Sequence, residues 1–412
     1  MIKPLVIVLS RSHATALSVI RSLGAVGYTI DLIASAHRRG GSIVAASSKY
    51  VRNVVELVSN RVREGQEEAE TALVAELLKR AGQNETKPVL FPTDDYTTAV
   101  IDCHRSELEP YYLMPSIVGA EDGTMMNLMD KTVQAEMARQ VGLPVPQEWV
   151  FDLTKEPVVP EDMVFPCYCK PIKSITGYKG EMAVCKNEAE LLAHMNRLRS
   201  KFANRSILVQ EFLNIDYEID LSGVCLDQEV IIPAIIRKTR VAQQTKGVTL
   251  TGKIIPFEEL GDLQEKVVEL LKKFRYEGMF DMELTVVGDR IYFNEVNLRS
   301  GGPNYAYFKS GVNLPALFVK EILGERHLPE EEKVSEYGKT LINERVVWDD
   351  YINGFITKKE LKQAFEQADI TLLYNKEDPM PQRLFRLWMW LRIIKRGRNP
   401  QISQRRKALK AR

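Results

Sequence analysis

Cysteine is scarce in this sequence, and long hydrophobic runs are missing from it. Five cysteines among 412 residues are too few for a disulfide framework, and Cys167-Tyr168-Cys169 has no second pair or histidine cluster at zinc spacing. A reducing, cytoplasmic compartment is therefore expected. The apolar run near the N-terminus has about six residues, and nothing approaches the roughly 20 apolar residues that cross a bilayer. From these absences we expect that the protein is not exported and has no membrane-spanning helix.

Net charge is also nearly absent, at +1. Such a balance gives the whole molecule no general attraction to nucleic acid or other acidic polymers. The charge is unevenly distributed, because residues 380–412 contain eleven of the 56 Lys and Arg residues and no Asp or Glu. The rest of the chain consequently has 45 cationic residues against 55 acidic ones.

The basic tail, residues 380–412, allows two interpretations. Trp388 and Trp390 lie among apolar and cationic residues, as in segments that rest on an anionic membrane surface. The apolar positions do not form a clean one-sided stripe, so a helix that packs on the core, followed by a basic end, is an equal alternative. Nucleic-acid binding is not expected, because the aromatic part is apolar rather than interleaved for base stacking. The sequence thus leaves a peripheral location on the inner face of the membrane open.

A dinucleotide-binding loop is missing from the N-terminal region. Residues 1–115 alternate apolar strand patterns with helical patterns, which predicts a parallel sheet wound with helices. The first strand-to-helix turn, SRSHAT, lacks G-x-G-x-x-G and so gives no support to a dehydrogenase. Ser10, His13 and the pair Asp94-Asp95 lie at expected strand ends, where α/β sheets bind ligands. His13 taken alone is more often structural, and the two Asp residues either cap a helix or contact substrate.

The remaining chain divides into recognisable regions. A helix that begins near Asp130 is broken by the prolines of residues 143–146, and strand patterns with short, antiparallel connections follow. We expect an α/β (α+β) fold with a Rossmann-like domain first and a two-lobed domain second. The expected boundaries are 1–115, 116–325 with a central lobe at about 150–220, a C-terminal extension at 326–379 and the basic tail.

Two strand patterns, at residues 281–287 and 291–298, flank a turn at 288–290 that contains Gly288. A hairpin closed by this three-residue turn places Glu283 opposite Glu295 and Asp281 opposite Asn297, with all four side chains on one face. Facing acids are unfavourable unless a cation lies between them. Oxygen ligands at this spacing suit magnesium, which takes one or two carboxylates and shares the phosphates of a nucleotide.

Other groups along the chain are candidates for contacts with a nucleotide. Arg299 extends the hairpin face with a planar fork for phosphate or acyl-phosphate oxygens. Lys170 closes a strand before a loop that contains Ser174 and Gly177, where an ammonium and backbone N–H groups can hold phosphate. Lys131 opens the helix after Asp130. Read alone, the Lys170 loop is explained at least as well by an ordinary hairpin turn with a surface lysine. Lys131 read alone is likewise more often a surface residue.

A strand that ends at Glu211 is followed by Leu213 and, after a short turn, by Glu218. Backbone groups at such a strand edge can pair with an adenine while aliphatic side chains sandwich the ring, and a carboxylate a few residues on can accept ribose hydroxyls. A hairpin salt bridge explains Glu218 equally well when it is read alone.

In this order the groups resemble the ATP-grasp superfamily. The resemblance covers nearly the whole chain to about Leu323, and includes the strand that ends in Lys-Pro, the glycine loop, the acid-bearing hinge and the final E-x-N-x-R. Within the superfamily the chain is most similar to carboxylate-amine ligases of the D-aspartate ligase type. The shared features are the Phe-Asp-Met start of the hairpin, Glu-Val-Asn-Leu-Arg at 295–299 and Gly-Val-Asn-Leu at 311–314. The resemblance implies a pre-ATP-grasp domain followed by a two-lobed ATP-grasp domain.

The resemblance also implies roles for the candidate residues. It assigns Lys131 and Lys170 to phosphate, with the loop of Ser174 and Gly177 beside them, and it assigns Glu211 and Leu213 to adenine and Glu218 to ribose. Glu295 and Asn297 would bind magnesium or manganese, with either Asp281 or Glu283 as the first metal acid. Arg299 and Lys170 would stabilise the transferred phosphoryl group. The loop has fewer glycines than in many members, which leaves its own phosphate contacts open.

The implied reaction is ATP-dependent activation of a carboxylate as an acyl phosphate, which an amine then attacks, with ADP and phosphate released. A small-molecule carboxylate and an amine are the implied partners, and a cell-envelope or peptide-like precursor is one substrate class. A basic segment at 237–246 is either a lid or a plain surface connection. Two other activities remain open: an ATP-grasp kinase or phosphotransferase, and a non-catalytic ATP-binding regulator at the membrane. A homodimer is also left open.

Overall fold

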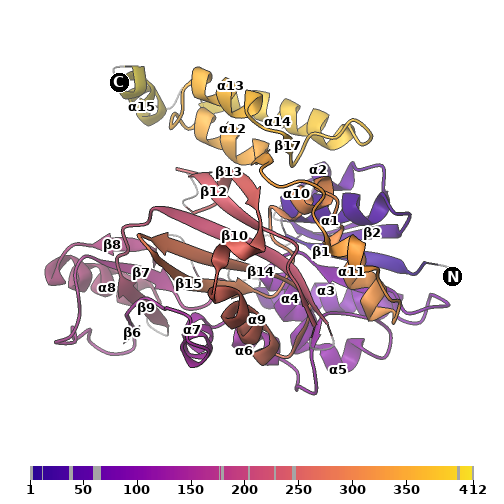
Figure 1. Cartoon of the computed structure of the whole chain (residues 1–412), viewed down its shortest axis with the longest axis horizontal. Helices are drawn as coiled ribbons and strands as arrows, with labels where there is room; N and C mark the ends of the chain where they lie inside the picture. Colours follow the sequence, from indigo (N-terminus) through magenta and orange to yellow (C-terminus); the bar gives the residue numbers. More distant parts are fainter. Residues whose placement is uncertain are drawn as a thin grey trace.

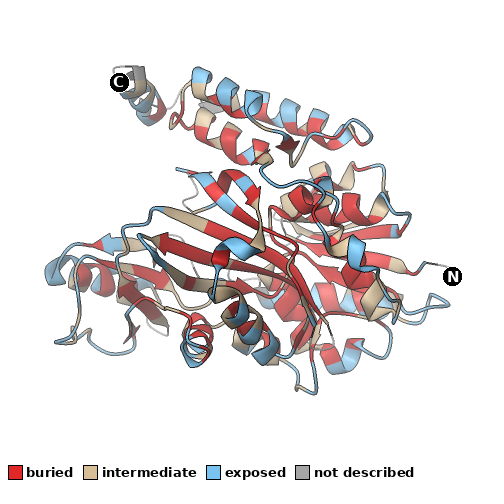
Figure 2. Cartoon of the chain, in the orientation of Figure 1, coloured by how far each residue is buried: buried red, intermediate tan, exposed pale blue. Residues whose placement is uncertain are grey.

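The computed structural model describes all residues except 1–2, 12, 37–39, 59–65, 176, 178–180, 203–204, 227–228, 244–246, 397–399 and 411–412. Three sheets organise the molecule, and a layer of helices formed by the C-terminal residues lies at the top in Figure 1. The side chains of the strands are mostly buried, whereas the outer helices carry most of the exposed residues (Figure 2). Mixed α/β architecture is therefore confirmed.

The N-terminal domain is built on a parallel four-stranded sheet in the order β3-β2-β1-β4. The predicted alternation of strands and helices is confirmed. Its strands are β1 (Leu5–Ser10), β2 (Thr29–Ala36), β3 (Val51–Val58) and β4 (Val89–Pro92), and its helices are α1 (His13–Gly24), α2 (Ile43–Ala46), α3 (Gln66–Arg80), α4 (Asp95–Cys103) and α5 (Arg105–Leu108). In this order the switch point lies between the carboxyl ends of β1 and β4, where open α/β sheets bind ligands.

A connecting segment leads to a small lobe, residues 148–211. The segment contains β5 (Ser116–Ile117), α6 (Thr124–Leu128) and α7 (Lys131–Gln140), and the Asp130 side chain caps α7 by accepting a hydrogen bond from the Thr132 N–H. The small lobe is an antiparallel sheet in the order β6-β9-β7-β8. Its elements are β6 (Glu148–Asp152), β7 (Cys167–Pro171), β8 (Ala183–Cys185), α8 (Glu188–Phe202) and β9 (Ser206–Glu211).

Three thiols meet in the core of the small lobe. Cys167 and Cys169 have no partner at zinc spacing in the sequence, but the pairing of β7 with β8 brings Cys185 beside them, and the three sulfur atoms lie within 4.8 Å of one another. All three side chains are buried among apolar residues, and none forms a disulfide. In this setting they pack as small hydrophobic residues.

A nine-stranded sheet forms the centre of the molecule. Its order is β15-β14-β10-β12-β13-β16-β17, with β11 paired to β10 and β5 paired to β14. The further strands are β10 (Tyr217–Leu226), β11 (Glu229–Ile231), β12 (Ile235–Val241), β13 (Thr249–Ile255), β14 (Tyr276–Val287), β15 (Arg290–Asn297), β16 (Thr340–Ile342) and β17 (Ile370–Thr371). The helices between these strands are η2 (Phe257–Leu260), α9 (Leu263–Lys273), α10 (Asn304–Lys309), α11 (Leu314–Ile322) and η3 (Pro329–Glu332).

The first half of the segment expected as a lid or a surface connection, residues 237–246, is strand. Residues 237–241 belong to β12 and pair with β13 in the middle of the large sheet, and residues 244–246 lie outside the described residues. Of the described residues in this segment only Arg237 also pairs with β10, and Gly247 and Val248, just after the segment, line the main cavity, so the lid stays a prediction.

The C-terminal residues add strands to the large sheet and a layer of helices above it. Strands β16 and β17 of the expected extension join the sheet beside β13. The helices are α12 (Glu344–Ile352), α13 (Lys358–Glu366), α14 (Met380–Arg396) and α15 (Pro400–Lys410), and they gather at one end of the molecule (Figure 1). In the described part of the chain no helix combines the length and apolarity that crossing a membrane needs.

Candidate active site

A cavity of about 690 Å³ lies where the N-terminal domain, the small lobe and the large sheet meet. Ten of the residues predicted as site residues line it: Lys131, Lys170, Ser174, Glu211, Leu213, Glu218, Asp281, Glu283, Glu295 and Arg299. They are spread from Lys131 to Arg299 along the chain, and the fold brings them together around one cavity. Asp94 and Asp95 add the carboxyl end of β4 to the same cavity.

The hairpin of β14 and β15 carries the acidic wall. Asp281 pairs with Asn297 and Glu283 pairs with Glu295, as the alternation of side chains predicts. The predicted three-residue turn is wrong, because Val287 pairs with Arg290 and the turn is only Gly288-Asp289. Gly288 has φ +56°, a left-handed conformation that favours glycine. A bulge farther along the hairpin restores the register that the shorter turn would have shifted.

The bulge places Asn294 in the cavity, and sequence alternation could not have found it. Leu284 pairs with Phe293 while Glu283 pairs with Glu295, so Asn294 is the extra residue of β15. Its Oδ1 accepts a hydrogen bond of 2.9 Å from Lys170 Nζ. Strict alternation assigns Asn294 to the opposite face of the strand, and no sequence signal marks the bulge.

Two predicted site residues lie away from the cavity wall. The Asn297 Nδ2 donates to the main-chain oxygen of Asp281 over 3.3 Å, so this amide braces the hairpin. Gly177 lies against the end of β7, where an added Cβ would come 2.5 Å from Pro171 Cγ. Neither residue is among those that line the cavity. Much of the predicted glycine loop, including residues 176 and 178–180, lies outside the described residues.

Two lysines and Glu295 form one charged group in the cavity. Lys131 Nζ lies 2.7 Å from Glu295 Oε2 and donates to Ser174 Oγ over 2.9 Å. Burial acts to raise the pKa of Glu295, but the charges of Lys131 and Lys170 outweigh it and lower the pKa to about 2. Burial and the nearby Lys131 lower the pKa of Lys170 to about 8. Glu295 is thus ionised across the neutral range.

Lys238 is a buried cation that the sequence prediction placed only in the basic segment at 237–246. Its side chain is 2% exposed, and its Nζ lies 2.9 Å from Asp220 Oδ1, 3.4 Å from Glu218 Oε2 and 3.6 Å from Glu283 Oε2. Burial opposes its charge, yet the three carboxylates raise its pKa. The alternation of β12 puts Lys238 on the face of Ile236, but only the pairing of three distant strands shows that acids surround it.

Asp281 and Glu283 of β14 have raised pKa values. Burial raises the pKa of Glu283 to about 8, although Lys238 partly offsets this effect, and Asp220 and Glu295 add to it. Burial also raises the pKa of Asp281 to about 6 against the lowering effect of Arg299. The two carboxyl groups differ in their contacts. Asp281 accepts from Ser222 Oγ at 2.9 Å and lies 3.3 Å from Arg299 NH1.

Arg299 links the hairpin to the N-terminal domain. Its Nε lies 3.0 Å from Asp95 Oδ1, and its pKa is raised by Asp95 and Asp281 although burial opposes its charge. The neighbouring Asp94 caps α4 by accepting from the Thr97 N–H at 3.0 Å. Asp94 therefore caps the helix, and Asp95 pairs with the predicted phosphate-binding arginine, whereas contact of either residue with substrate stays a prediction.

The other end of the cavity is apolar. Its walls include Tyr168 and Met182 of the small lobe, Phe212 and Leu213 of the segment after β9, and Phe293 of the hairpin. The Glu211 carboxylate is engaged by the backbone, because its Oε1 accepts from the Gln147 N–H at 2.9 Å. The cavity thus has an apolar end and a charged end. A nucleotide needs both, because its base is apolar and its phosphates are charged.

Gly301 is required by the close approach of Asp281. A Cβ on Gly301 would lie 2.0 Å from Asp281 Oδ1, whereas a Cβ on Gly302 would meet nothing within 4 Å. We predict that Gly301→Ala displaces the Asp281 carboxylate and lowers the free energy of unfolding by about 1–3 kcal/mol, as overpacking does. Gly302→Ala is the matched control, with an expected change within about 0.5 kcal/mol. Urea unfolding measures both variants, and equal losses would contradict the packing described.

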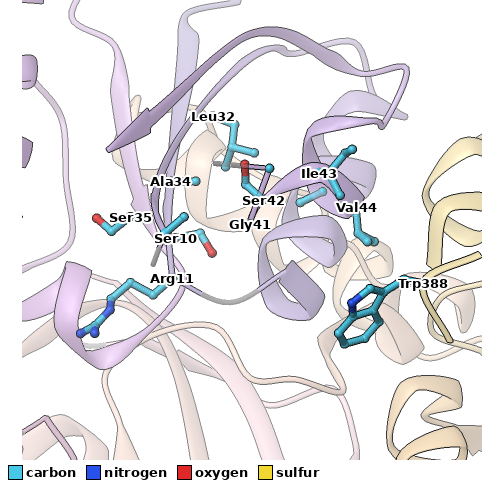
Figure 3. Close-up of a pocket in the computed structure, with 13 residues that line it drawn as sticks. Ser10, Arg11, Leu32, Ala34, Ser35, Gly41, Ser42, Ile43, Val44 and Trp388 are labelled. Atoms are coloured by element: carbon cyan, nitrogen blue, oxygen red, sulfur yellow. The ribbon is translucent and has the colours of Figure 1, made fainter. Parts of the chain in front are cut away.

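A second, smaller pocket of about 280 Å³ lies at the carboxyl ends of β1 and β2. Ser10, predicted as a strand-end residue, lines this pocket rather than the larger cavity, together with Arg11 and Trp388 of α14 (Figure 3). The Arg11 N–H donates to Asp94 Oδ2 over 2.5 Å, which connects the rims of the two sites. The side chain of His13 lies outside the described residues.

Known proteins resemble the central region of this chain in sequence and most of the chain in fold. A model of the ATP-grasp domain matches residues 136–301. The formate-dependent phosphoribosylglycinamide formyltransferase of Alcanivorax borkumensis is 24% identical over 229 residues, or 53% of this chain and 55% of that protein. A carbamoyl phosphate synthase large chain, C-terminal section, of Methanocaldococcus jannaschii is 25% identical over 65% of this chain and 38% of that protein. The chain thus spans about half or less of these curated relatives.

Solved structures resemble most of the chain. The L-amino acid ligase from Bacillus licheniformis superposes with a TM-score of 0.60 at 14% identity, covering 82% of this chain and 78% of that one. The ADP complex of N5-carboxyaminoimidazole synthetase from Staphylococcus aureus gives 0.59 at 14% identity, with 82% of each chain covered. The biotin carboxylase domain dimer of the Hydrogenobacter thermophilus 2-oxoglutarate carboxylase, with MgADP, gives 0.61 at 15% identity, covering 81% and 72%. The chain therefore shares the fold of these structures, and its residues 136–301 match the ATP-grasp domain.

Proposed function

We propose that the protein is an ATP-dependent ligase that activates a carboxylate as an acyl phosphate and joins it to an amine. One observation carries the proposal: a single cavity joins an apolar compartment to a wall where buried carboxylates and cations alternate. Solved structures of similar fold include a protein named as a ligase and one named as a synthetase, which supports the reaction class. The five free cysteines agree with a reducing cytoplasm as the place of action.

We expect the nucleotide to bind in one orientation, with its base at the apolar end of the cavity and its phosphates at the charged end. Its base would enter the apolar compartment between Tyr168 and Phe293, with the backbone after Glu211 at its edge. Glu218 Oε2 is buried and lies 3.4 Å from Lys238 Nζ, and a carboxylate oxygen beside one cation can still accept from a ribose hydroxyl. The phosphates would then reach Lys131 and Lys170, which stand at the charged end.

The hairpin residues fit a divalent cation such as magnesium or manganese. Glu283 and Glu295 face each other across the two strands, and burial raises the pKa of Glu283 although Lys238 Nζ lies 3.6 Å from its carboxylate. A further cation between the two acids would stabilise the charged form of Glu283. Asp281 is already engaged by Ser222 and Arg299, so we infer that Glu283 and Glu295 are the principal metal ligands. Magnesium bound there would neutralise charge that develops on the phosphates during phosphoryl transfer.

The chain's own residues would position the reacting groups and neutralise their charge. Lys170 and Lys131 hold negative oxygens of the donor phosphate, and Arg299 offers its guanidinium to the phosphoryl group as it moves. The substrate carboxylate oxygen forms a bond to the γ-phosphorus, and the bond from that phosphorus to the β-phosphate oxygen breaks to release ADP. The amine nitrogen then bonds to the acyl carbon, phosphate leaves, and the nitrogen loses a proton. No protein nucleophile is needed.

The carboxylate and amine would bind between the hairpin and the switch point of the N-terminal domain. Thr93, Asp94 and Asp95 end β4 at the wall of the cavity, and Arg299 spans from there to the hairpin. Strand ends at a switch point are the usual place for a ligand in an open α/β sheet. A small-molecule carboxylate and an amine are the partners that this position supports.

The experiment for the proposed function measures phosphate release from ATP and magnesium. Amino acids and short peptides are supplied as carboxylates and amines, singly and in pairs, and ADP and AMP are separated. Release of phosphate with ADP that requires both substrates supports the ligase. A phosphorylated product formed without an amine would identify a kinase, and ATP binding without any stimulated release would favour a regulator.

The lowered pKa of Lys170 leads us to predict that ATP affinity depends on pH. Its pKa of about 8 reflects burial and Lys131, which Glu295, Glu148 and Glu283 only partly oppose. The ammonium form is therefore lost as the pH rises through about 8, and phosphate binding must then take up a proton. ATP affinity should fall, by up to about tenfold per pH unit, above about pH 8. Titration calorimetry with Lys170→Met as the pH-insensitive control measures this effect. Equal slopes for the two proteins would contradict it.

A further inference from the structure

Helix α14 is held on the protein by one apolar face. Phe385 and Met389 are 4% and 3% exposed and pack against Ile352 of α12. Arg392, one turn farther along, forms an ion pair with Asp349 of α12. These contacts fix which side of α14 faces the protein and which side faces away.

The opposite side of α14 carries a second apolar face. Leu387, Trp390, Leu391 and Ile394 follow the spacing of one helix face, and each is between 52% and 58% exposed. We call these four residues the outer stripe. Met380 and Trp388 of α14 are also exposed, at 44% and 39%, but lie outside these four residues, and Val158 and Leu328 are exposed in other parts of the chain. A contiguous exposed apolar stripe on a helix marks an interaction surface.

The charges around the outer stripe restrict its partner. Arg383 and Arg386 are exposed and lie one turn before Leu387 and Trp390 on the same side of α14. Residues 380–412 contain eleven cationic residues and no acid. A second copy docked face to face would bring two such basic segments together, which like charges oppose. An anionic lipid surface complements both features, since it offers phosphates to arginines and acyl chains to the stripe.

We propose that α14 docks the protein on an anionic phospholipid bilayer. The helix lies flat in the interface, with the outer stripe at the depth of the headgroups and Arg383 and Arg386 on lipid phosphates. Trp390, whose side chain is 58% exposed, contacts the bilayer in this arrangement. Trp388 instead lines the smaller pocket at the carboxyl ends of β1 and β2 (Figure 3). The C-terminal helices lie together at one end of the molecule, so docking there leaves the rest of the fold clear of the bilayer (Figure 1). The proposal does not depend on the ligase activity.

Vesicle co-sedimentation of the full-length protein tests the proposal. Vesicles of equimolar phosphatidylglycerol and phosphatidylcholine should bind the protein, and vesicles of phosphatidylcholine alone should not. The variant Leu387→Ser/Ile394→Ser should bind the anionic vesicles at least about tenfold more weakly. The matched control is Val158→Ser/Leu328→Ser, which changes two exposed apolar residues elsewhere and should bind like the original protein. Circular dichroism checks that both variants keep their fold.

Two more readouts separate a lipid surface from other partners. Arg383→Gln/Arg386→Gln should weaken binding to anionic vesicles and make it less sensitive to salt. Anionic vesicles should shift Trp emission to the blue, and Trp390→Phe should remove most of that shift. The proposal is overturned if neither vesicle type binds the protein, or if the stripe variant binds as tightly as the original. It is also overturned if the stripe variant only converts a dimer to a monomer in sedimentation equilibrium.

Discussion

Glu295→Gln should lower turnover by at least about 10²-fold, the size of loss that follows when one preorganised electrostatic group is removed. The amide keeps the shape of the side chain and can still accept a hydrogen bond from Lys131, which lies 2.7 Å from the carboxylate. It cannot supply the negative oxygen that pairs with Glu283 around a cation. Turnover is measured as ADP and phosphate released in the presence of both substrates.

The control for this variant lies on the same hairpin. Asp289→Asn changes an acid in the turn between β14 and β15, far along the hairpin from the cavity, and should leave turnover unchanged within about twofold. Thermal unfolding of both variants shows that the hairpin still forms. A fully active Glu295→Gln protein would contradict the assignment of this carboxylate to the metal.

Lys238→Met should destabilise the fold by about 3–5 kcal/mol, the usual cost of leaving buried charges without their partner. The ammonium is 2% exposed and lies among Glu218, Asp220 and Glu283, so its loss leaves three buried carboxylates without their shared cation. Methionine has nearly the same length and would fill the space without its charge. Urea unfolding in the presence of a chelator measures the loss without help from added metal.

Lys253→Met is the matched control for this measurement. Lys253 lies on the neighbouring strand β13 and is exposed, so its replacement should change the free energy of unfolding by no more than about 0.5 kcal/mol. If both lysine variants were equally stable, Lys238 would not be the cation that balances the acidic wall.

The hairpin shows what alternation along a strand can predict. Side chains repeat every second residue, so the shared face of Asp281 and Glu283 followed from the sequence. The pairing of Glu283 with Glu295 was predicted from a three-residue turn and is correct because a bulge offsets the shorter turn. Turn length did not follow, because Gly288-Asp289 can close a two-residue turn as well as begin a three-residue turn. The bulge at Asn294 compensates for that error, and nothing in the local pattern distinguishes these two arrangements.

Burial was the property that the sequence could not reveal. Lys238 reads as one cation of a basic segment, and only the order β14-β10-β12 surrounds it with acids from two other strands. The stripe of α14 was obscured for a related reason. Its sequence carries apolar residues on two sides, and the inward face must be recognised by its packing on Ile352 before the outer stripe becomes distinct.

The transfer of oxygen from the substrate carboxylate to phosphate tests the central claim most directly. A carboxylate labelled with heavy oxygen is incubated with ATP, magnesium and the amine, and the released phosphate is analysed by mass spectrometry. Activation as an acyl phosphate predicts one labelled oxygen in each phosphate released, because the carboxylate oxygen that bonds to phosphorus leaves with it. Product formed together with wholly unlabelled phosphate would contradict the proposed reaction.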